Sequence, residues 1–443
     1  MIEVLITAAL ALSVLGAGAY LVWNTHPAWI ISIAVALSVF AGHWENMGVP
    51  GPLAPERLLL LAGIAGVLLR APPIRDRPAL RIEWVHWLLI AAGLYAVVSA
   101  LFAGTLTERA DFLALVQTYG LLPFAVFFVM PAAFQEARHR RVLLGALVIL
   151  GGYLGVTALL ETIGPRALVY PAYILDPSVG IHVGRARGPF AEAVSNGVGL
   201  FACAIAAGLA LVYLRSGLAR AAAFGVIVLC AIGLLFTLQR SIWLATVATV
   251  ALVLVAVRDL RKFVVPVTVG GGLVVAIALT SVPGLEDKAS QRGRQERTVW
   301  ERQNQIQAAV NMINAHPAFG VGWARFPAES VSFFELGDDI PLVGAGGESH
   351  NVYFRYASEL GLVGFALWLA ATLAALLGGL LRRGPPELAP WRVALGAYAL
   401  FYGFVAAFVP PQAFPPLVFW VLAGVVWVRS EPTPGHKPTP LSA

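Results

Sequence analysis

Long, unbroken runs of apolar residues dominate this sequence. Apolar residues make up 59% of the chain and charged residues only 12%, whereas a soluble domain typically contains about 25% charged residues. The runs are continuous and do not alternate with polar residues, which argues against the strands of an outer-membrane barrel. Because backbone polar groups in lipid must be satisfied within one segment, such runs favour helices. We therefore expect an all-α polytopic membrane protein.

A membrane-spanning helix needs roughly 20 apolar residues, and the chain offers about 12–13 such segments. We expect spans at residues 2–23, 28–43, 57–70, 84–103, 112–130, 142–161, 196–214, 221–238, 241–257, 263–281, 351–381, 393–409 and 414–428. The third segment is short, so the count is either 12 or 13. The first segment lacks the basic residues that begin a secretory signal, so we expect it to be a membrane helix.

Basic residues concentrate in alternate connections between the expected spans. These connections lie at residues 70–81, 138–141, 215–220, 258–262 and 382–392. Because short loops rich in Lys and Arg stay in the cytoplasm, the other connections are expected on the external side. The external connections are 104–111, 162–195, 239–240 and 283–350, and a chain with 13 spans would also have an external N-terminus.

Four regions follow from this arrangement. Residues 1–282 are expected to form transmembrane helices with the external loop 162–195, and residues 283–350 a large external loop between the tenth and eleventh spans. Residues 351–429 would form the C-terminal transmembrane helices. Residues 430–443 are polar and rich in proline, which is typical of a disordered tail, here on the cytoplasmic side.

The large external loop contains one expected helix. Ile306, Val310 and Ile313 recur at helical spacing and predict an amphipathic helix over residues 300–314. His316-Pro317 is expected to end it, because a proline disfavours the helical conformation of the residue before it. Residues 320–323 follow as a turn, and residues 324–347 as an irregular loop.

Arginines on the external side are candidates for anion binding. Arg240 lies between two apolar runs, where an arginine either reaches to the membrane interface or pairs with an anion. The arginines at positions 185, 187, 292, 294, 297, 302 and 325 either form solvated charged patches or bind phosphate groups. Arginine suits the second role because its planar guanidinium binds phosphate in a bidentate manner.

His350 is the candidate for proton transfer. It follows Gly346-Gly347-Glu348-Ser349 and directly precedes an apolar segment. Its unperturbed pKa of about 6.5 suits a general base near neutral pH, and a nearby helix N-terminus disfavours its protonated form. A structural histidine at the start of a helix would show the same pattern, so both interpretations stay open. His316, in contrast, is interpreted as structural.

Several chemical signatures are absent from the sequence. It contains no glycine-rich phosphate loop of the P-loop type, no Cys/His metal-ligand spacing and no Gly-x-Ser-x-Gly elbow. The two cysteines, Cys203 and Cys230, lie within apolar segments, as small core residues commonly do. We therefore expect no metal, no cofactor and no nucleic-acid partner.

An ordered series of motifs resembles the bacterial O-antigen ligase and O-antigen polymerase superfamily of membrane glycosyltransferases. The motifs are Arg187-Gly188-Pro189-Phe190, Thr237-Leu238-Gln239-Arg240-Ser241, Arg297-Thr298-Val299-Trp300, His316-Pro317-Ala318-Phe319-Gly320-Val321-Gly322, His350-Asn351-Val352-Tyr353 and Ser358-Glu359-Leu360-Gly361-Leu362-Val363-Gly364. Each motif is weak alone, but the set in this order is specific, and it covers roughly residues 185–370. Gln239 departs from the small serine usual before the arginine, and residues 192–196 lack the His/Asn-Pro often found there.

The resemblance implies a helical fold of the GT-C type in the bacterial inner membrane, with an active site facing the periplasm. The donor would be a glycan on undecaprenyl pyrophosphate, and the acceptor a sugar hydroxyl of lipid A–core in a ligase or of the growing glycan in a polymerase. His350 would be the general base of a metal-independent, inverting transfer, supported by Asn351 and Glu359. The donor pyrophosphate would be bound by arginines, with Arg240 and Arg297 also assigned to catalysis; the full set is Arg185, Arg187, Arg240, Arg294 and Arg297.

Three alternatives stay open at this point. The shared motifs do not separate ligase from polymerase, and Arg294 and Arg297 are equally placed as the loop arginine. A transporter of an anionic lipid or solute would use the same arginines without chemistry. Such transporters commonly show inverted repeats and paired broken helices, and the sequence shows neither.

Overall fold

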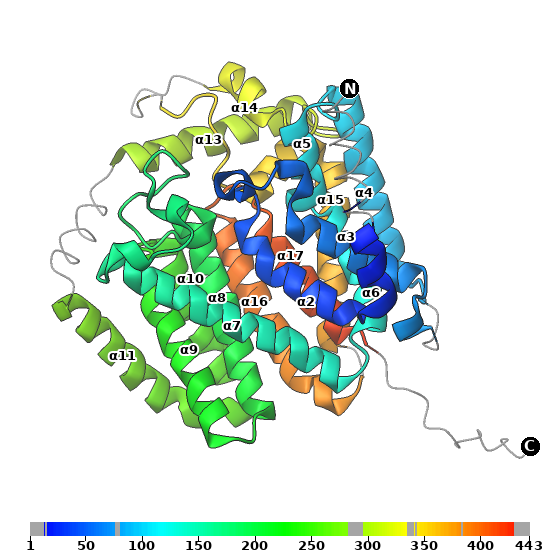
Figure 1. The fold of residues 1–443 in the computed structure, drawn as a ribbon. Coiled ribbons are helices and arrows are strands. Elements are labelled where there is room, and N and C mark those ends of the chain that lie inside the picture. The colour runs from blue at the N-terminus through cyan, green and yellow to red at the C-terminus, as the bar shows by residue number, and fades with distance from the viewer. Residues whose placement is uncertain are drawn as a thin grey trace, which may run out of the picture.

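The computed structural model describes residues 13, 16–75, 80–281, 296–334, 341, 343–381 and 384–428. Helices account for 77% of the structure, and the described residues contain no strand. The helices gather into one bundle, with two further helices across one end (Figure 1). The expectation of an all-α polytopic membrane protein is confirmed.

The longer helices are α4 (Trp84–Ala103), α7 (Ala137–Thr162), α8 (Ala193–Tyr213), α9 (Gly217–Phe236), α10 (Arg240–Ala256), α11 (Val264–Ser281), α13 (Glu296–Ala315), α15 (Val352–Leu381) and α16 (Ala389–Ala406). The shorter ones are α2 (Pro27–Leu37), α3 (Pro55–Leu68), α5 (Arg109–Leu113), α6 (Leu121–Ala133), α14 (Phe326–Glu329) and α17 (Phe414–Val426). Each span predicted between residues 28 and 428 overlaps one of these helices. Most of the first predicted span, residues 2–23, and the predicted tail, residues 430–443, lie outside the described residues.

Seven helical segments in the described part of the chain are long and apolar enough to cross a membrane. Three further apolar helices are shorter, at Pro27–Phe40, Arg240–Ala256 and Phe414–Val426. A helix rises about 1.5 Å per residue and the hydrocarbon core is roughly 30 Å thick, so these three are short for a full crossing. The number of spans, about 12 or 13, therefore stays a prediction.

The predicted span 112–130 is not one continuous α-helix. Helix α5 passes into a π-helical segment, η5 (Ala114–Tyr119), and Gly120 separates this segment from α6. Gly120 has φ +130°, and a Cβ at this position would lie 2.8 Å from the ring of Phe124. A glycine is therefore required where the chain changes helix type, because other residues rarely adopt this φ.

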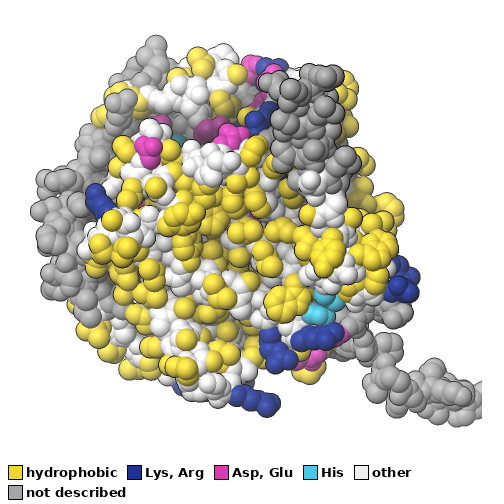
Figure 2. Space-filling model, in the orientation of Figure 1, with side chains coloured by type: hydrophobic (Ala, Val, Ile, Leu, Met, Phe, Trp, Pro, Cys, Tyr) yellow, Lys and Arg dark blue, Asp and Glu magenta, His cyan; other side chains and the backbone are white. Residues whose placement is uncertain are grey.

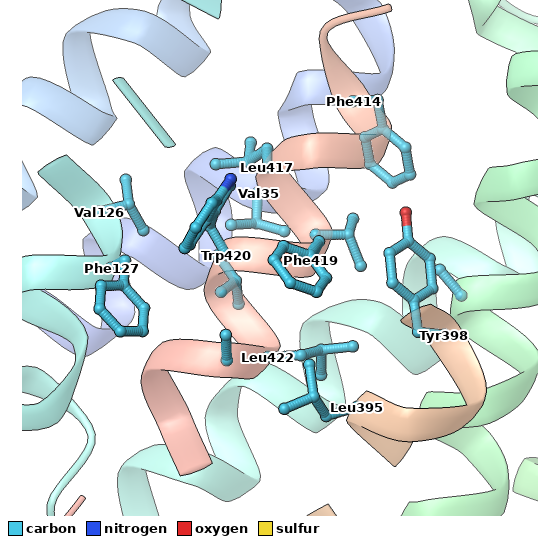
Figure 3. Packing of buried hydrophobic residues seen from close by; sticks show 14 of the residues in the cluster. Val35, Val126, Phe127, Leu395, Tyr398, Phe414, Leu417, Phe419, Trp420 and Leu422 are labelled. Carbon is cyan, nitrogen blue, oxygen red and sulfur yellow. The ribbon is translucent and has the colours of Figure 1, made fainter. Parts of the chain in front are cut away.

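Helix α17 lies at the centre of the bundle (Figure 1). All of its residues are buried, and it packs against α6, α8, α15 and α16. Figure 3 shows Trp420 of α17 beside Phe127 of α6, with ring centroids 5.4 Å apart in an edge-on arrangement. A helix that is apolar on every side is typical of the core of a large protein or of a membrane span.

The outer surface of the bundle is also apolar. Large hydrophobic side chains are exposed on α4 and α10, including Leu101 and Val247. Figure 2 shows hydrophobic side chains over the middle of the molecule and basic side chains at its lower end. A surface this apolar is not stable in water, whereas it matches the hydrocarbon of a bilayer.

The described residues of the large connection 283–350 form a cap over one end of the bundle. They contain α13, α14 and a short 3-10 helix at Ser330–Phe333, and α13 and α14 lie across the upper end in Figure 1. The predicted helix 300–314 corresponds to α13, which ends before Pro317 as expected. The buried face of α13 differs from the predicted apolar stripe, because it consists of Asn304, Gln305, Ala308, Ala309 and Met312. Ile306, from the predicted stripe, is 38% exposed.

Candidate active site

Helix α15 is interrupted at Gly361, and the turn after α13 fills the interruption. Gly361 has φ +66° and ψ +177°, which breaks the helical hydrogen-bond pattern. The backbone N–H groups of Leu362 and Val363 instead donate to the carbonyl oxygens of Pro317 (2.8 Å) and Ala318 (3.3 Å). Free backbone groups inside a helical bundle are costly, so these bonds hold the end of α13 against α15.

The same turn also donates hydrogen bonds to the carbonyl groups of α15. The N–H groups of Val321 and Gly322 donate to the carbonyl oxygens of Ser358 (3.0 Å) and Glu359 (2.9 Å). Gly320, at φ +68°, lies so close to α15 that a Cβ there would collide with the backbone of Glu359 and Gly361. The two glycine-containing motifs of the sequence thus form one interlocked contact.

Glu359 stabilises this contact from within the bundle. Its side chain is fully buried, and Oε1 accepts hydrogen bonds from the backbone N–H of Phe326 (3.1 Å) and from Nε of Arg355 (3.1 Å). Arg355 also forms an ion pair with Glu348, two residues before His350. Glu359 therefore supports the cap and the segment that leads into α15.

Asn351 begins α15 and fixes the position of its neighbour His350. Its Oδ1 accepts from the backbone N–H groups of Tyr353 and Phe354, both at 3.0 Å, as expected of a residue that caps a helix N-terminus. Its Nδ2 donates to the carbonyl oxygen of Ala407, just after α16 (3.0 Å). The backbone at His350 is thus tied to two helices of the bundle.

The side chain of His350 bonds to Gln305 on the buried face of α13. One oxygen, Oε1 of Gln305, accepts from the backbone N–H of His350 (3.3 Å) and lies 2.8 Å from ring atom Nδ1. Because the backbone N–H can only donate, the atom that it meets is the amide oxygen, and Nδ1 must then carry a proton. In a neutral imidazole the other nitrogen, Nε2, holds the lone pair.

His350 is held in this neutral form by its surroundings. Burial lowers the pKa of His350 below its ordinary value of 6.5, and the charge of Arg302 lowers it further, whereas Glu301 raises it. Within the described part of the chain, Nε2 has no hydrogen-bond partner. The imidazole can therefore accept a proton at Nε2 near neutral pH.

Two arginines lie within electrostatic range of one another beside this histidine. Arg302 is on α13, one turn before Gln305, and burial together with the charge of Arg240 lowers its pKa. Its Nε is buried and has no hydrogen-bond partner among the described residues. Like charges repel when they approach, so an anion near both guanidinium groups would be stabilised.

A tight turn between α9 and α10 positions Arg240. Thr237 is fully buried and its hydroxyl donates to the carbonyl oxygen of Leu234 (2.7 Å), while the ring of Trp243 donates to the same oxygen (2.9 Å). Leu238 has φ +50°, an unusual conformation for a residue with a branched side chain. The chain therefore reverses within three residues, and Arg240 is the first residue of α10, with its side chain exposed.

Arg187 has a structural role in this fold. Its side chain is 2% exposed, and its guanidinium donates to the carbonyl oxygens of Ile174 (2.9 Å), Val179 (2.7 Å) and Asp176. These bonds close the loop 174–187 and leave the guanidinium committed to the backbone. We therefore do not include Arg187 among the residues that we propose to bind the donor pyrophosphate.

Arg185 lies beside the turn that carries Arg240. The N–H of the next residue, Ala186, donates to the carbonyl oxygen of Phe236 at the end of α9 (2.9 Å). Nε of Arg185 is buried and has no hydrogen-bond partner among the described residues. Arg185 is thus available to an anion near Arg240.

Two of the arginines expected to bind the donor, Arg294 and Arg297, precede Arg302 in the chain. Arg294 lies outside the described residues, and only the backbone of Arg297, in the first turn of α13, is described. Among the described residues, Arg302 interacts electrostatically with both Arg240 and His350. From the sequence, Arg302 was only one of seven candidate external arginines, and Gln305 was not a candidate. Arg302 and Gln305 are three residues apart, which places both on one helix face. This spacing was the sequence feature that could have indicated that they act together.

Residues 225–369 match a family model described as O-antigen ligase. This region is therefore similar to the O-antigen ligase family. The match contains Arg240, Arg302, Gln305, His350 and the interlocked glycines, and it supports the O-antigen ligase and polymerase superfamily. It therefore supports ligase or polymerase activity in general, and so an enzyme in a membrane. No curated protein matches the chain.

Proposed function

We propose that this protein transfers a glycan from undecaprenyl pyrophosphate to a sugar hydroxyl of lipid A–core at the periplasmic face of the inner membrane. One observation carries the proposal. A neutral histidine with an unoccupied Nε2 lies beside Arg302, which in turn interacts with Arg240. This combination supplies both a proton acceptor and positive charge for a pyrophosphate.

The proposed reaction is a single displacement with inversion. The acceptor hydroxyl oxygen attacks the anomeric carbon and forms the new glycosidic bond, while His350 Nε2 takes the hydroxyl proton. The bond between the anomeric carbon and the pyrophosphate oxygen breaks, and its electron pair leaves with undecaprenyl pyrophosphate. His350 returns the proton to water after the product departs.

The proposed roles of the arginines follow from where charge develops. The pyrophosphate gains negative charge as it leaves, and prearranged guanidinium groups in a partly buried site stabilise that charge. Arg240 and Arg302 are assigned to this role, with Arg185 as a further ligand, and Arg294 and Arg297 stay as candidates. Removal of one such donor costs about 10²–10³ in rate in other enzymes.

The test is transfer by the purified full-length protein with undecaprenyl pyrophosphate glycan and lipid A–core. We expect His350→Ala to abolish transfer while thermal stability is preserved. His316→Ala is the matched control, because His316 is exposed in the turn after α13 and is not assigned to the site. Transfer by His350→Ala at the wild-type rate would refute the proposal.

The acceptor distinguishes a ligase from a polymerase. A polymerase would use the same donor chemistry and the same residues, so variants do not separate the two activities. Lipid A–core and lipid-linked glycan should therefore be offered separately to the wild-type protein. Transfer to lipid A–core supports the ligase, and chain growth on lipid-linked glycan alone supports the polymerase.

A further inference from the structure

A cavity of about 830 Å³ opens at the end of the bundle opposite to the candidate active site. It is bounded by the start of α7, the end of α8, the start of α9 and the start of α16. Trp391, near the start of α16, lines the cavity, whereas Ala407, just after the end of α16, bonds to Asn351. At a rise of 1.5 Å per residue, these two positions are about 24 Å apart.

One end of the cavity is basic. Arg140, Arg141 and Arg215 line it, and Glu387 is the one carboxylate in the lining. The guanidinium of Arg140 already has partners within the protein. It donates hydrogen bonds to the carbonyl oxygens of Phe134 (3.0 Å) and Gln135 and lies 3.9 Å from the carboxylate of Glu387. Arg141 and Arg215 are exposed, and neither makes an ion pair or hydrogen bond with another described residue. Two uncompensated positive charges therefore face the cavity.

The rest of the lining is apolar. Leu144, Val148 and Ile149 follow Arg141 along α7, and Ala222 and Ala223 line the wall from α9. Ile149 is 76% exposed, so this wall continues onto the outer surface of the bundle. From Arg141 to Ile149 the lining extends about 12 Å along the helix axis. A basic end joined to an apolar wall of this length matches a lipid headgroup followed by the first part of an acyl chain.

We propose that this cavity binds one anionic phospholipid of the cytoplasmic leaflet. Its phosphate would lie between Arg141 and Arg215, and one acyl chain would follow Leu144 and Val148. The leaflet follows from the orientation predicted by the basic loops. Anionic lipids concentrate in that leaflet, and basic pockets between helices on this side bind their headgroups.

The experiment measures lipid retained by the purified full-length protein. Protein in detergent is mixed with equal amounts of phosphatidylglycerol and phosphatidylcholine of the same acyl chains, and bound lipid is counted by native mass spectrometry. We expect one phosphatidylglycerol to be retained in preference to phosphatidylcholine. In the double variant Arg141→Gln/Arg215→Gln the preference should fall at least 10-fold, since each arginine near an anionic headgroup contributes roughly a factor of five.

Two further variants distinguish the contribution of the cavity to lipid binding from a general effect of positive charge. Gly145→Leu should also lower retention, because a Cβ at Gly145 meets no atom within 4 Å and the added side chain would project into the cavity without a backbone clash. Arg220→Gln/Arg258→Gln removes two exposed arginines outside the lining and should retain the wild-type preference.

Either of two results would overturn the proposal. One is the same lipid preference in the wild-type protein and in both cavity variants. The other is displacement of the bound lipid by glycerol phosphate at equal concentration, because a ligand without acyl chains would then suffice.

Discussion

Gln305 Oε1 accepts hydrogen bonds from both the backbone N–H and the ring Nδ1 of His350, at 3.3 Å and 2.8 Å. A single atom on α13 thus sets the position of the residue before α15 and the tautomer of its ring. Gln305 touches no reacting atom in the proposed transfer. It is a positioning residue, and its effect is transmitted through His350.

Replacement of Gln305 tests this positioning. In Gln305→Leu the ring is free to carry its proton on Nε2, so we expect the transfer rate to fall by about 10²-fold, within the range that general-base help supplies. Donor affinity should be unchanged. Gln305→Glu retains an acceptor oxygen and should restore activity, with the acid limb of the pH–rate profile moved to higher pH. A structural role alone would not move that limb.

The pH dependence of transfer follows from the lowered pKa of His350. As the pH falls through that pKa, Nε2 becomes protonated and can no longer accept a proton, so the rate falls on the acid side. Because burial and Arg302 place the pKa below 6.5, we expect the midpoint of the fall below that pH. Arg302→Gln should raise the midpoint and Glu301→Gln should lower it. Equal midpoints in the three proteins would contradict this electrostatic account.

Arg240 and Arg302 should act on the same step. We expect Arg240→Gln and Arg302→Gln each to lower the transfer rate by about 10²–10³. If both bind one pyrophosphate, the double variant should lose less than the product of the single losses. Rates from purified proteins at saturating donor provide the measurement. Strictly multiplicative losses would indicate that the two arginines bind separate groups.

Arg187→Gln should reduce stability and not donor binding. The variant leaves three backbone carbonyl groups without their charged donor, which should cost roughly 2–3 kcal/mol in the free energy of unfolding. Donor affinity measured below the melting temperature should equal that of the wild-type protein. A specific loss of donor affinity with unchanged thermal stability would return Arg187 to the proposed donor site.

Gly361→Ala tests the interlocked contact between α13 and α15. An added Cβ would collide with the carbonyl group of Ala318, so we expect a lower melting temperature together with lost transfer. Gly48→Ala is the matched control, because Gly48 also has a positive φ (+78°) but has open space around its Cβ position. In the control, the free energy of unfolding should fall only by the cost of a positive φ in a residue with a Cβ, about 1–2 kcal/mol. Equal effects of the two variants would show that the close approach to Ala318 is unimportant.

Periodic and local features of the chain were predictable. The apolar segments indicated the helices between residues 28 and 428, and His316-Pro317 marked the end of α13. The buried face of α13 was not predictable in the same way. Its apolar stripe was taken from Ile306, Val310 and Ile313, whereas the structure buries Asn304 and Gln305 because the segment before α15 offers them polar partners. Hydrophobic pattern alone does not indicate such partners.

The sequence by itself determined that this is a helical membrane protein and that His350 and Arg240 belong to an ordered set of motifs. Those features depend on local composition and on order along the chain. Only the tertiary structure showed which described residues lie near them. In the folded structure Arg187 donates to backbone carbonyl groups, whereas Arg302 and Gln305 lie near His350. The sequence did not indicate these contacts, because hydrogen bonds and electrostatic fields depend on distance in space and not on separation in the chain.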